Sequence, residues 1–398
     1  MVSCLFLQAS TQPSSKQRPP AGFVYAQGTR FFKDGSPWYF QGTNIYWLGI
    51  ASIDKYSDVT VQGIFNDLSK AGIRVIRFWG FGHGWSHMTT DSRGQWTLTQ
   101  AAWARLDLCV SQASQYGIKV IFPFVNFEPD LLGMQFFAQQ VLGPGVERER
   151  FYVDSRVFKV YQGYVNNIIY HWNPLTGRRY IDEPAILAWE LANEPHTGDS
   201  FEMGGQYPHF QYGDTGVLIG KGQVVGRLVN QWLCRAATYI KSLDQNHMVT
   251  TGEEGYRSYG PDMPFNQWLN NGMKGVDYEA NVKCPDIDFN TLHVYPDNWR
   301  IPFNNFHWDR AALSIAANKP IVLEEYGCCK QADYAGKRDV VFQAMHQAAD
   351  NLGFAGTIVW QLLPWSGLEA DSNYDFAPTE TGGPEVLAHA ALQNARSW

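Results

Sequence analysis

The sequence contains no apolar run approaching the roughly 20 residues of a membrane-spanning helix, which argues against a membrane-spanning protein. It also contains no block of lysine and arginine, and its net charge is −7. Because nucleic-acid-binding proteins usually carry a basic patch, nucleic acid is not the expected partner. Cysteine is scarce, with six residues, none of them in a C-x-x-C pair or at a zinc-ligand spacing. We therefore expect no membrane partner, no nucleic-acid partner and no zinc site.

The six cysteines permit disulfide bonds without identifying them. Cys109 and Cys234 fall inside helical patterns, where a buried free thiol is the simplest expectation. Cys328 and Cys329 are adjacent, and a bond between neighbours is strained, so each would bond more readily to a cysteine elsewhere.

Aromatic residues are abundant, with 15 Trp, 20 Tyr and 24 Phe. Such side chains fill a hydrophobic core or stack on sugar rings, and composition alone does not separate these two uses.

The N-terminal segment differs from the rest in composition. "VSCLFLQAS" resembles the end of a secretion signal, although it lacks a basic start, and "TQPSSKQRPP" is typical of a disordered leader. We assign residues 1–20 to a disordered leader or signal remnant and residues 21–398 to a single domain. The expected location is secreted and extracellular.

A helical segment that ends at glycine and leads at once into a short apolar strand recurs along the chain. "ARLDLCVSQASQYG" before "IKVIFPFVN" is one example. Glycine after the last turn permits the left-handed conformation that caps a helix. The strands are continuous apolar runs, typical of a parallel sheet covered on both faces. The alternation predicts βα units.

Eight strands are predicted in this alternation, at residues 39–46, 74–79, 119–124, 185–191, 247–252, 288–295, 320–326 and 356–362. Eight βα units predict an α/β protein with a single (β/α)8 TIM barrel. The chain exceeds the typical barrel length, so we expect long βα loops, above all at 127–150, 196–222 and 255–285. The alternative is an open doubly wound sheet, which would need a glycine-rich phosphate turn after its first strand, where "GTNIYWLG" stands instead.

Polar and aromatic residues follow the predicted strands at their C-terminal ends, where barrel enzymes carry their catalytic groups. Among them are the carboxylates Glu194, Glu253, Glu254 and Glu325, so that a pair can face each other across the barrel mouth. A glycosidic bond is cleaved by such a pair, one protonated near the leaving oxygen and one ionised near the anomeric carbon. This chemistry needs no metal or cofactor, and we expect neither.

The motifs "AWELANEP" and "VLEEYG" resemble those of glycoside hydrolase family 5. "FYVDSRVFKVYQGYVNNIIYHWNPLTGRRYIDEP", "GTNIYWLG" and "LHVYPDNW" narrow the resemblance to the endo-β-1,4-mannanases of that family, from about residue 23 to the C-terminus. The resemblance implies that residues 21–398 are the catalytic domain. It assigns Glu194 as the acid/base and Glu325 as the nucleophile. Because Pro195 follows Glu194, we expect an extended backbone at Glu194, and because adjacent strand residues alternate, we expect Glu324 and Glu325 to face opposite sides.

The resemblance also implies a substrate-binding set. Asn193 would bind the 2-hydroxyl of the sugar, Arg77 would keep the nucleophile ionised, and Tyr295 would donate a hydrogen bond to it. His293 would shape the site, and Trp360 would lie under the sugar. The remaining candidates for substrate binding are Asn126, Trp47 and Trp299. Four aromatic residues could equally well pack in the core or stack on sugar: Trp47, Trp79, Phe127 and Trp299.

Two segments depart from the mannanase pattern. The third strand leads into "VNFEPD", with Phe127 and Glu128 in place of the usual pair, and His196 follows Pro195 where many mannanases carry arginine. The predicted substrate is β-mannan or manno-oligosaccharides, cleaved by a monomer. Exo-β-mannosidase activity is the first alternative, because a long loop after the acid/base can block one end of a cleft. Cellulase-type activity on glucans is a weaker alternative, because the segment from "FYVD" to "TGRRYIDEP" points to mannan. From another class, a non-catalytic carbohydrate-binding barrel is also weaker, since both glutamates are present.

Overall fold

The computed structural model describes residues 18–50, 57–129, 131, 133–197, 221–258, 267–270, 272, 274–299, 308–330, 337–363 and 373–397. Most of the expected leader, Cys4 and most of the 196–222 loop lie outside these residues. Within the described part, no helix combines the length and the apolar character that crossing a bilayer requires.

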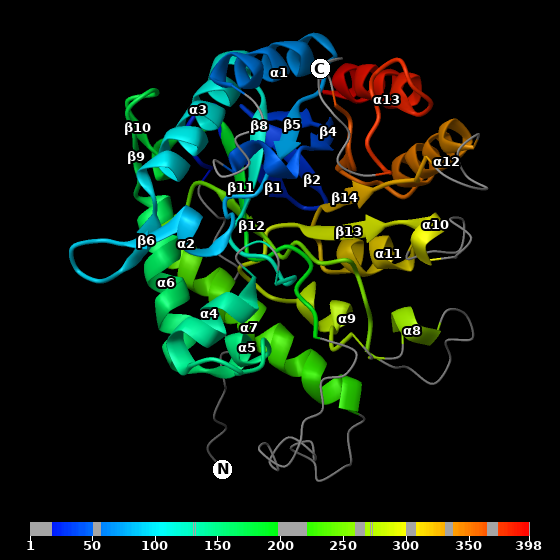
Figure 1. Ribbon diagram of the computed structural model, residues 1–398. Helices are drawn as coiled ribbons and strands as arrows, with labels where there is room; N and C mark the ends of the chain where they lie inside the picture. The colour runs from blue at the N-terminus through cyan, green and yellow to red at the C-terminus, as the bar shows by residue number, and fades with distance from the viewer. Residues whose placement is uncertain are drawn as a thin grey trace, which may run out of the picture.

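Eight parallel strands form one sheet that curves around a central axis, as Figure 1 shows. In spatial order they are β12 (Met248–Thr250), β11 (Ile186–Glu190), β8 (Lys119–Pro123), β5 (Val75–Arg77), β4 (Phe40–Asn44), β15 (Gly356–Val359), β14 (Ile321–Tyr326) and β13 (Asn290–Val294). The two outer strands meet again, because Thr250 forms a parallel bridge with Phe289 and its hydroxyl donates to the Phe289 carbonyl at 3.0 Å. The predicted barrel is confirmed, and each strand lies within its predicted segment.

Helices surround the strands (Figure 1). The long ones are α1 (Asp58–Lys70), α3 (Gln100–Tyr116), α6 (Ser155–Ile169), α7 (Lys221–Leu243), α12 (Arg338–Asn351) and α13 (Gly383–Arg396), and the shorter α11 (Asp309–Ala316) lies between β13 and β14 in the sequence. The capping signals read from the sequence are in place around α3. The Thr99 hydroxyl accepts a hydrogen bond from the Ala102 amide at its start, and Gly117 ends it with a φ of 67°.

The loops predicted to be long contain short elements of their own. The segment 127–150 carries α4 (Met134–Leu142), and the segment 255–285 carries α8 (Gln267–Asn270) and α9 (Tyr278–Asn281). The other short elements are η1 (Tyr46–Gly49), α2 (Gly84–His87), β6 (Met88–Thr90), β7 (Trp96–Leu98), α5 (Arg150–Val153), β9 (Trp172–Asn173), β10 (Arg178–Arg179), η2 (Tyr180–Asp182) and α10 (Pro296–Trp299).

A small antiparallel sheet precedes the barrel and was not predicted. It consists of β1 (Val24–Gln27), β2 (Arg30–Lys33) and β3 (Ser36–Trp38). Its apolar side chains join a cluster with residues from the N-terminal part of the barrel strands. Phe31, for example, packs edge-to-face on Phe289 at a centroid distance of 5.2 Å. This sheet covers the N-terminal end of the barrel, so the C-terminal end is the one left for a cleft.

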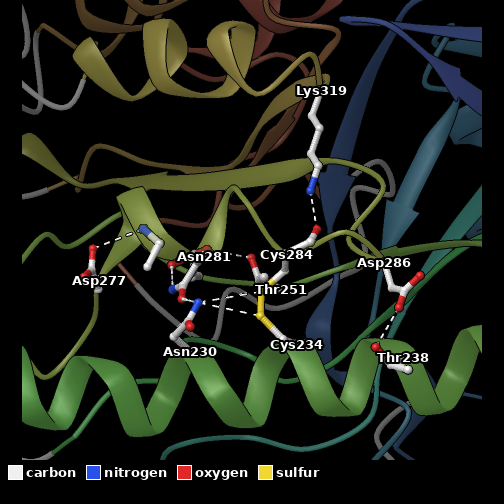
Figure 2. The surroundings of a disulfide bond; sticks show 11 residues. Asn230, Cys234, Thr238, Thr251, Asp277, Asn281, Cys284, Asp286 and Lys319 are labelled. Atoms are coloured by element: carbon white, nitrogen blue, oxygen red, sulfur yellow. Dashed lines mark hydrogen bonds between the residues drawn. A yellow bond between two sulfur atoms is a disulfide. The ribbon is translucent and has the colours of Figure 1, made fainter. Parts of the chain in front are cut away.

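A disulfide bond joins Cys234 of α7 to Cys284, which follows α9 (Figure 2). The expectation of a free thiol at Cys234 is therefore wrong, because the fold brings together two cysteines that are 50 residues apart in the sequence. Asn230, one helical turn before Cys234, donates to the side chain of Asn281 at 3.0 Å and lies beside both sulfur atoms (Figure 2). Cys109 and Cys328 are free and buried.

We expect the double variant Cys234→Ala/Cys284→Ala to lose about 4 kcal/mol of unfolding free energy, because the cross-link closes a loop of about 50 residues and so restricts the unfolded chain. Urea denaturation with and without dithiothreitol measures this. The reductant should destabilise the wild type and leave the double variant unchanged. Cys109→Ala, which removes a free buried thiol from α3, is the matched control and should retain the response to reductant. Equal stability of wild type and double variant would contradict the prediction.

Candidate active site

Arg77, the last residue of β5, stands at the centre of a buried polar cluster at the C-terminal ends of the strands. Its side chain has no exposed surface. The guanidinium donates to Glu190 through Nε and Nη2, both at 2.7 Å, and to Glu325 through Nη1 at 2.5 Å. It also donates to the side-chain oxygens of Asn44 at 3.0 Å and Asn193 at 2.7 Å. One planar cation thus fixes residues from three other strands and from the loop after one of them.

Glu190, the last residue of β11, is a member of this cluster that sequence reasoning missed. Burial raises the pKa of Glu190 to about 8, although the charge of Arg77 opposes the shift. The available signal was a carboxylate inside an otherwise apolar strand, in "AWEL". Because Glu190 takes two donors of Arg77, it determines how the guanidinium is turned toward Glu325.

Glu325 lies in β14, and both of its oxygens are hydrogen-bonded. Arg77 donates to one oxygen, and the Tyr295 hydroxyl donates to the other at 2.6 Å. Both contacts are those that the family resemblance implies. Burial raises the pKa of the Glu325 carboxyl, and His293 and Arg77 oppose this by favouring the charged form. The side chain is 4 % exposed, so the carboxylate is nearly enclosed.

Glu194 and His293 form a hydrogen-bonded pair beside Glu325. Nδ1 of His293 lies 2.8 Å from a Glu194 oxygen and 3.6 Å from a Glu325 oxygen. Burial alone would lower the pKa of His293, but Glu325, Glu194 and Glu324 raise it well above its usual value. The pKa of Glu194 is lowered, because His293 outweighs the effect of burial. Both shifts favour the proton of this hydrogen bond on His293 and the negative charge on Glu194. At 23 % exposure the Glu194 side chain is the more open of the two catalytic candidates to solvent.

The backbone at Glu194 is not extended as expected, because its φ is 49°, in the left-handed region. For a residue with a side chain this conformation costs roughly 1–2 kcal/mol. Hydrogen bonds compensate, since the Glu194 amide donates to the Gly252 carbonyl at 2.8 Å and the Asn193 amide donates to the Val125 carbonyl at 2.8 Å. The neighbouring strand ends override the local preference imposed by Pro195, and they aim the carboxylate across the barrel mouth.

Glu324 does not face away from Glu325 as predicted. One of its oxygens lies 3.3 Å from Nε2 of His293 and 3.9 Å from Nε of Arg77, both members of the same cluster. The pairing of β14 with β13 and with β15 shifts register next to these residues, so the simple alternation of side chains is interrupted here. His293 therefore lies between Glu324 on one ring nitrogen and Glu194 on the other.

The asparagines predicted to bind substrate are also joined to the cluster. Asn193 accepts from Arg77 and donates to the side-chain oxygen of Asn126 at 3.0 Å. Asn126 in turn pairs with Asn193 in a parallel bridge that extends β8 and β11. Their amides are thus oriented without substrate.

The aromatic residues separate into buried and half-buried ones. Trp47, Trp79 and Phe127 are at most 3 % exposed, which favours packing over sugar stacking. Trp360 is half-buried and lies parallel to Tyr46, with centroids 5.7 Å apart and an interplanar angle of 6°. Trp299 is half-buried beside Tyr295 at 6.1 Å. Trp360 and Trp299 therefore remain the candidates for contact with sugar.

Glu194, His293 and Glu325 also have the composition of a metal site, with one ligand atom from each lying within 4.8 Å of the others. However, Arg77 already binds Glu325, and its fixed positive charge repels a second cation. The same spacing suits a pair of carboxylates acting on one bond.

Glu253, in the loop after β12, is expected to make the stability of the protein depend on pH. It is buried, accepts hydrogen bonds from Thr251 and Asn281, and has a pKa raised by burial to about 7. A carboxyl group whose pKa is higher in the folded than in the unfolded protein adds most to the free energy of unfolding below about pH 4.3. This contribution is lost as the pH rises through 7. When the pH is raised from 5 to 8, the Tm of the wild type should therefore fall more than the Tm of Glu253→Gln, whose side chain does not titrate. A difference in Tm between the two that does not change with pH would contradict this.

Comparisons with known proteins agree with this geometry. A family model described as glycoside hydrolase (GH) family 5 beta-mannosidase-like matches residues 145–350. Mannan endo-1,4-beta-mannosidase 7 of Arabidopsis thaliana is 31% identical over 87% of this chain and 79% of its own length. Mannan endo-1,4-beta-mannosidase F of Aspergillus fumigatus is 33% identical over 95% of this chain and 77% of its own length. The crystal structure of the endo-1,4-beta-mannanase from Rhizomucor miehei has a TM-score of 0.77 at 25% identity, covering 94% of this chain and 99% of that one. The chain therefore belongs to the β-mannosidase-like glycoside hydrolases of family 5.

Proposed function

We propose that the chain is a retaining endo-β-1,4-mannanase that cleaves mannan, glucomannan or galactomannan. The observation that carries the mechanism is the proximity of Glu194 and Glu325, which each offer an oxygen within 4.8 Å of the other and of His293. Retaining glycosidases hold their two carboxyl groups about 5–5.5 Å apart, whereas inverting ones leave several ångströms more for a water molecule. Relatives named mannan endo-1,4-beta-mannosidases support the choice of substrate.

In this mechanism Glu325 attacks the anomeric carbon of a mannosyl unit while Glu194 gives a proton to the departing oxygen. The bond to the leaving sugar breaks as the ester bond to Glu325 forms. Glu194, now ionised, takes a proton from a water molecule, which attacks the same carbon and releases Glu325. The proton taken from water regenerates the acid for the next cycle, and the hydrogen bond to His293 at 2.8 Å holds it in the resting site.

Arg77 and Tyr295 support the nucleophile in this proposal. Their hydrogen bonds to the two Glu325 oxygens favour the carboxylate over the acid, and they keep the side chain oriented toward the cleft. A binding barrel without catalysis would have no use for a buried carboxylate held in this way, which disfavours that alternative.

Exo-β-mannosidase activity is the alternative within this chemistry. It was inferred from the long 196–222 loop, of which residues 198–220 lie outside the described part. We also propose that the protein is secreted and acts as a monomer. The disulfide bond between Cys234 and Cys284 supports an oxidising compartment.

Hydrolysis of mannohexaose tests both the linkage and the mode of cleavage. We expect mannobiose, mannotriose and mannotetraose from internal cuts, and proton NMR should show the β-anomer of the new reducing end first. Mannose as the sole early product would indicate exo action. Initial α-anomer would contradict retention, and no hydrolysis of mannohexaose alongside cleavage of cello-oligosaccharides would contradict the choice of mannan.

A further inference from the structure

The carbonyl group of Glu194 has an unusual hydrogen-bond partner, the imidazole two residues later. Nδ1 of His196 lies 2.8 Å from the Glu194 carbonyl oxygen. A carbonyl oxygen only accepts, so Nδ1 must carry the hydrogen. Pro195, between the two residues, has no N–H to offer. The hydrogen bond therefore closes a tight loop around the residue whose φ of 49° sets the direction of the Glu194 side chain.

His196 is itself firmly held. The Tyr152 hydroxyl donates to its carbonyl oxygen at 2.8 Å. Its ring packs on Phe127 with centroids 3.7 Å apart, and the guanidinium of Arg148 lies 3.6 Å from the centre of the Phe127 ring. Burial lowers the pKa of His196 to about 4, so the ring is neutral at ordinary pH and stays in the tautomer that the Glu194 carbonyl requires.

A second acceptor competes only weakly for this hydrogen. A carboxylate oxygen of Glu254 lies 3.4 Å from Nδ1 of His196, longer than the bond to the Glu194 carbonyl. The Tyr256 hydroxyl donates to the other oxygen of Glu254 at 2.5 Å. The main role of the His196 N–H is thus toward the backbone of Glu194.

We propose that His196 is a positioning residue for Glu194, which rests on the acid/base role proposed above. Its Nδ1–H holds the Glu194 carbonyl, and with it the left-handed backbone that points the carboxyl group at the glycosidic oxygen. Without this hydrogen bond the peptide plane after Glu194 can rotate and the carboxyl group shifts. Proton transfer is sensitive to such a shift, because a displacement of about 1 Å can lower a rate about 10²-fold.

Two substitutions separate the hydrogen bond from the rest of the side chain. His196→Asn keeps a nitrogen donor near the position of Nδ1, whereas His196→Gln places its polar group near Nε2. Two substrates separate proton donation from binding. Cleavage of mannotetraose needs a proton from Glu194, whereas 2,4-dinitrophenyl β-mannobioside releases a phenolate that needs none.

We expect His196→Gln to lower kcat/KM on mannotetraose about 10²-fold and to change the value on the dinitrophenyl substrate less than about threefold. His196→Asn should retain most of the activity on both. His171→Asn is the matched control, since His171 also packs on an aromatic ring, Trp103, at 3.6 Å and binds Asp107, but in another part of the fold. It should leave both activities unchanged.

Equal losses on the two substrates, or equal losses in the asparagine and glutamine variants, would overturn the positioning role. Should the His196 variants not fold, Tyr152→Phe removes only the hydroxyl that anchors His196. This variant should also lose more kcat/KM on mannotetraose than on the dinitrophenyl substrate, although the loss should be smaller. Equal losses on both substrates would again overturn the proposal. Glu194→Ala distinguishes a failure of the acid/base assignment of Glu194 from a failure of the positioning role of His196. If that variant loses both activities alike, the acid/base assignment itself fails, whereas a selective loss there beside uniform losses at His196 rejects only the inference about His196.

Discussion

Replacing Glu325 with alanine is expected to lower kcat on manno-oligosaccharides by on the order of 10⁴-fold or more, because the covalent route loses its nucleophile. Stability should change much less, since Arg77 keeps its two hydrogen bonds to Glu190 when Glu325 is removed. Steady-state kinetics on mannotetraose together with urea denaturation measure the two effects.

Glu324→Ala is the matched control for this prediction, because Glu324 is the preceding residue and a carboxylate in the same cluster. One of its oxygens lies 3.3 Å from His293 and 3.9 Å from Arg77, and the other accepts no hydrogen bond from any of the described residues. We expect it to alter site geometry or stability, with a loss of kcat of about 10-fold, in the range of a displaced catalytic group. If Glu324→Ala were inactive and Glu325→Ala active, the nucleophile would be Glu324 and the assignment to Glu325 would be wrong.

Replacing Arg77 with methionine is expected to reduce both stability and activity. Removing the cation leaves Glu190 and Glu325 buried without their partner, which typically costs about 3–5 kcal/mol of unfolding free energy. The pKa of Glu325 should also rise, because one of the two charges that favour its ionised form is lost. The acidic limb of the pH dependence of kcat/KM should therefore move to higher pH. Urea denaturation and pH–rate profiles measure these effects.

Arg310→Met provides the comparison for Arg77. Arg310 is also a buried arginine, and it donates to the Gly255 carbonyl at 2.8 Å and to Asn270 at 2.6 Å, without contact to either catalytic candidate. We expect a loss of stability in this variant with the acidic limb unmoved. If the acidic limb of the pH dependence of kcat/KM did not move in either variant, Arg77 would have only a structural role, and its proposed effect on the nucleophile would be wrong.

Local patterns determined the architecture of this protein. Apolar runs of six to eight residues between helices that end at glycine are properties of neighbouring residues, so the eight strands and their parallel arrangement could be read from the sequence. The order of polar residues after the strands, with the motifs of family 5, was sufficient to select Glu194 and Glu325. The small sheet β1–β3 escaped because its strands follow one another without helices between them and so lack the helix-to-strand alternation that marked the barrel strands.

Only the tertiary structure decided the contacts between these residues. Arg77 meets Glu190 and Glu325, 113 and 248 residues away, because closing the barrel brings the strand ends into one space, and no local pattern encodes such distances. The same holds for the pairing of Cys234 with Cys284. At Glu194 and Glu324 the local rules were overruled, by backbone hydrogen bonds from neighbouring strand ends and by shifts in strand register. The sequence thus determined which groups stand at the barrel mouth, while strand closure decided where they point, since hydrogen bonds between distant segments outweigh preferences of about 1–2 kcal/mol at single residues.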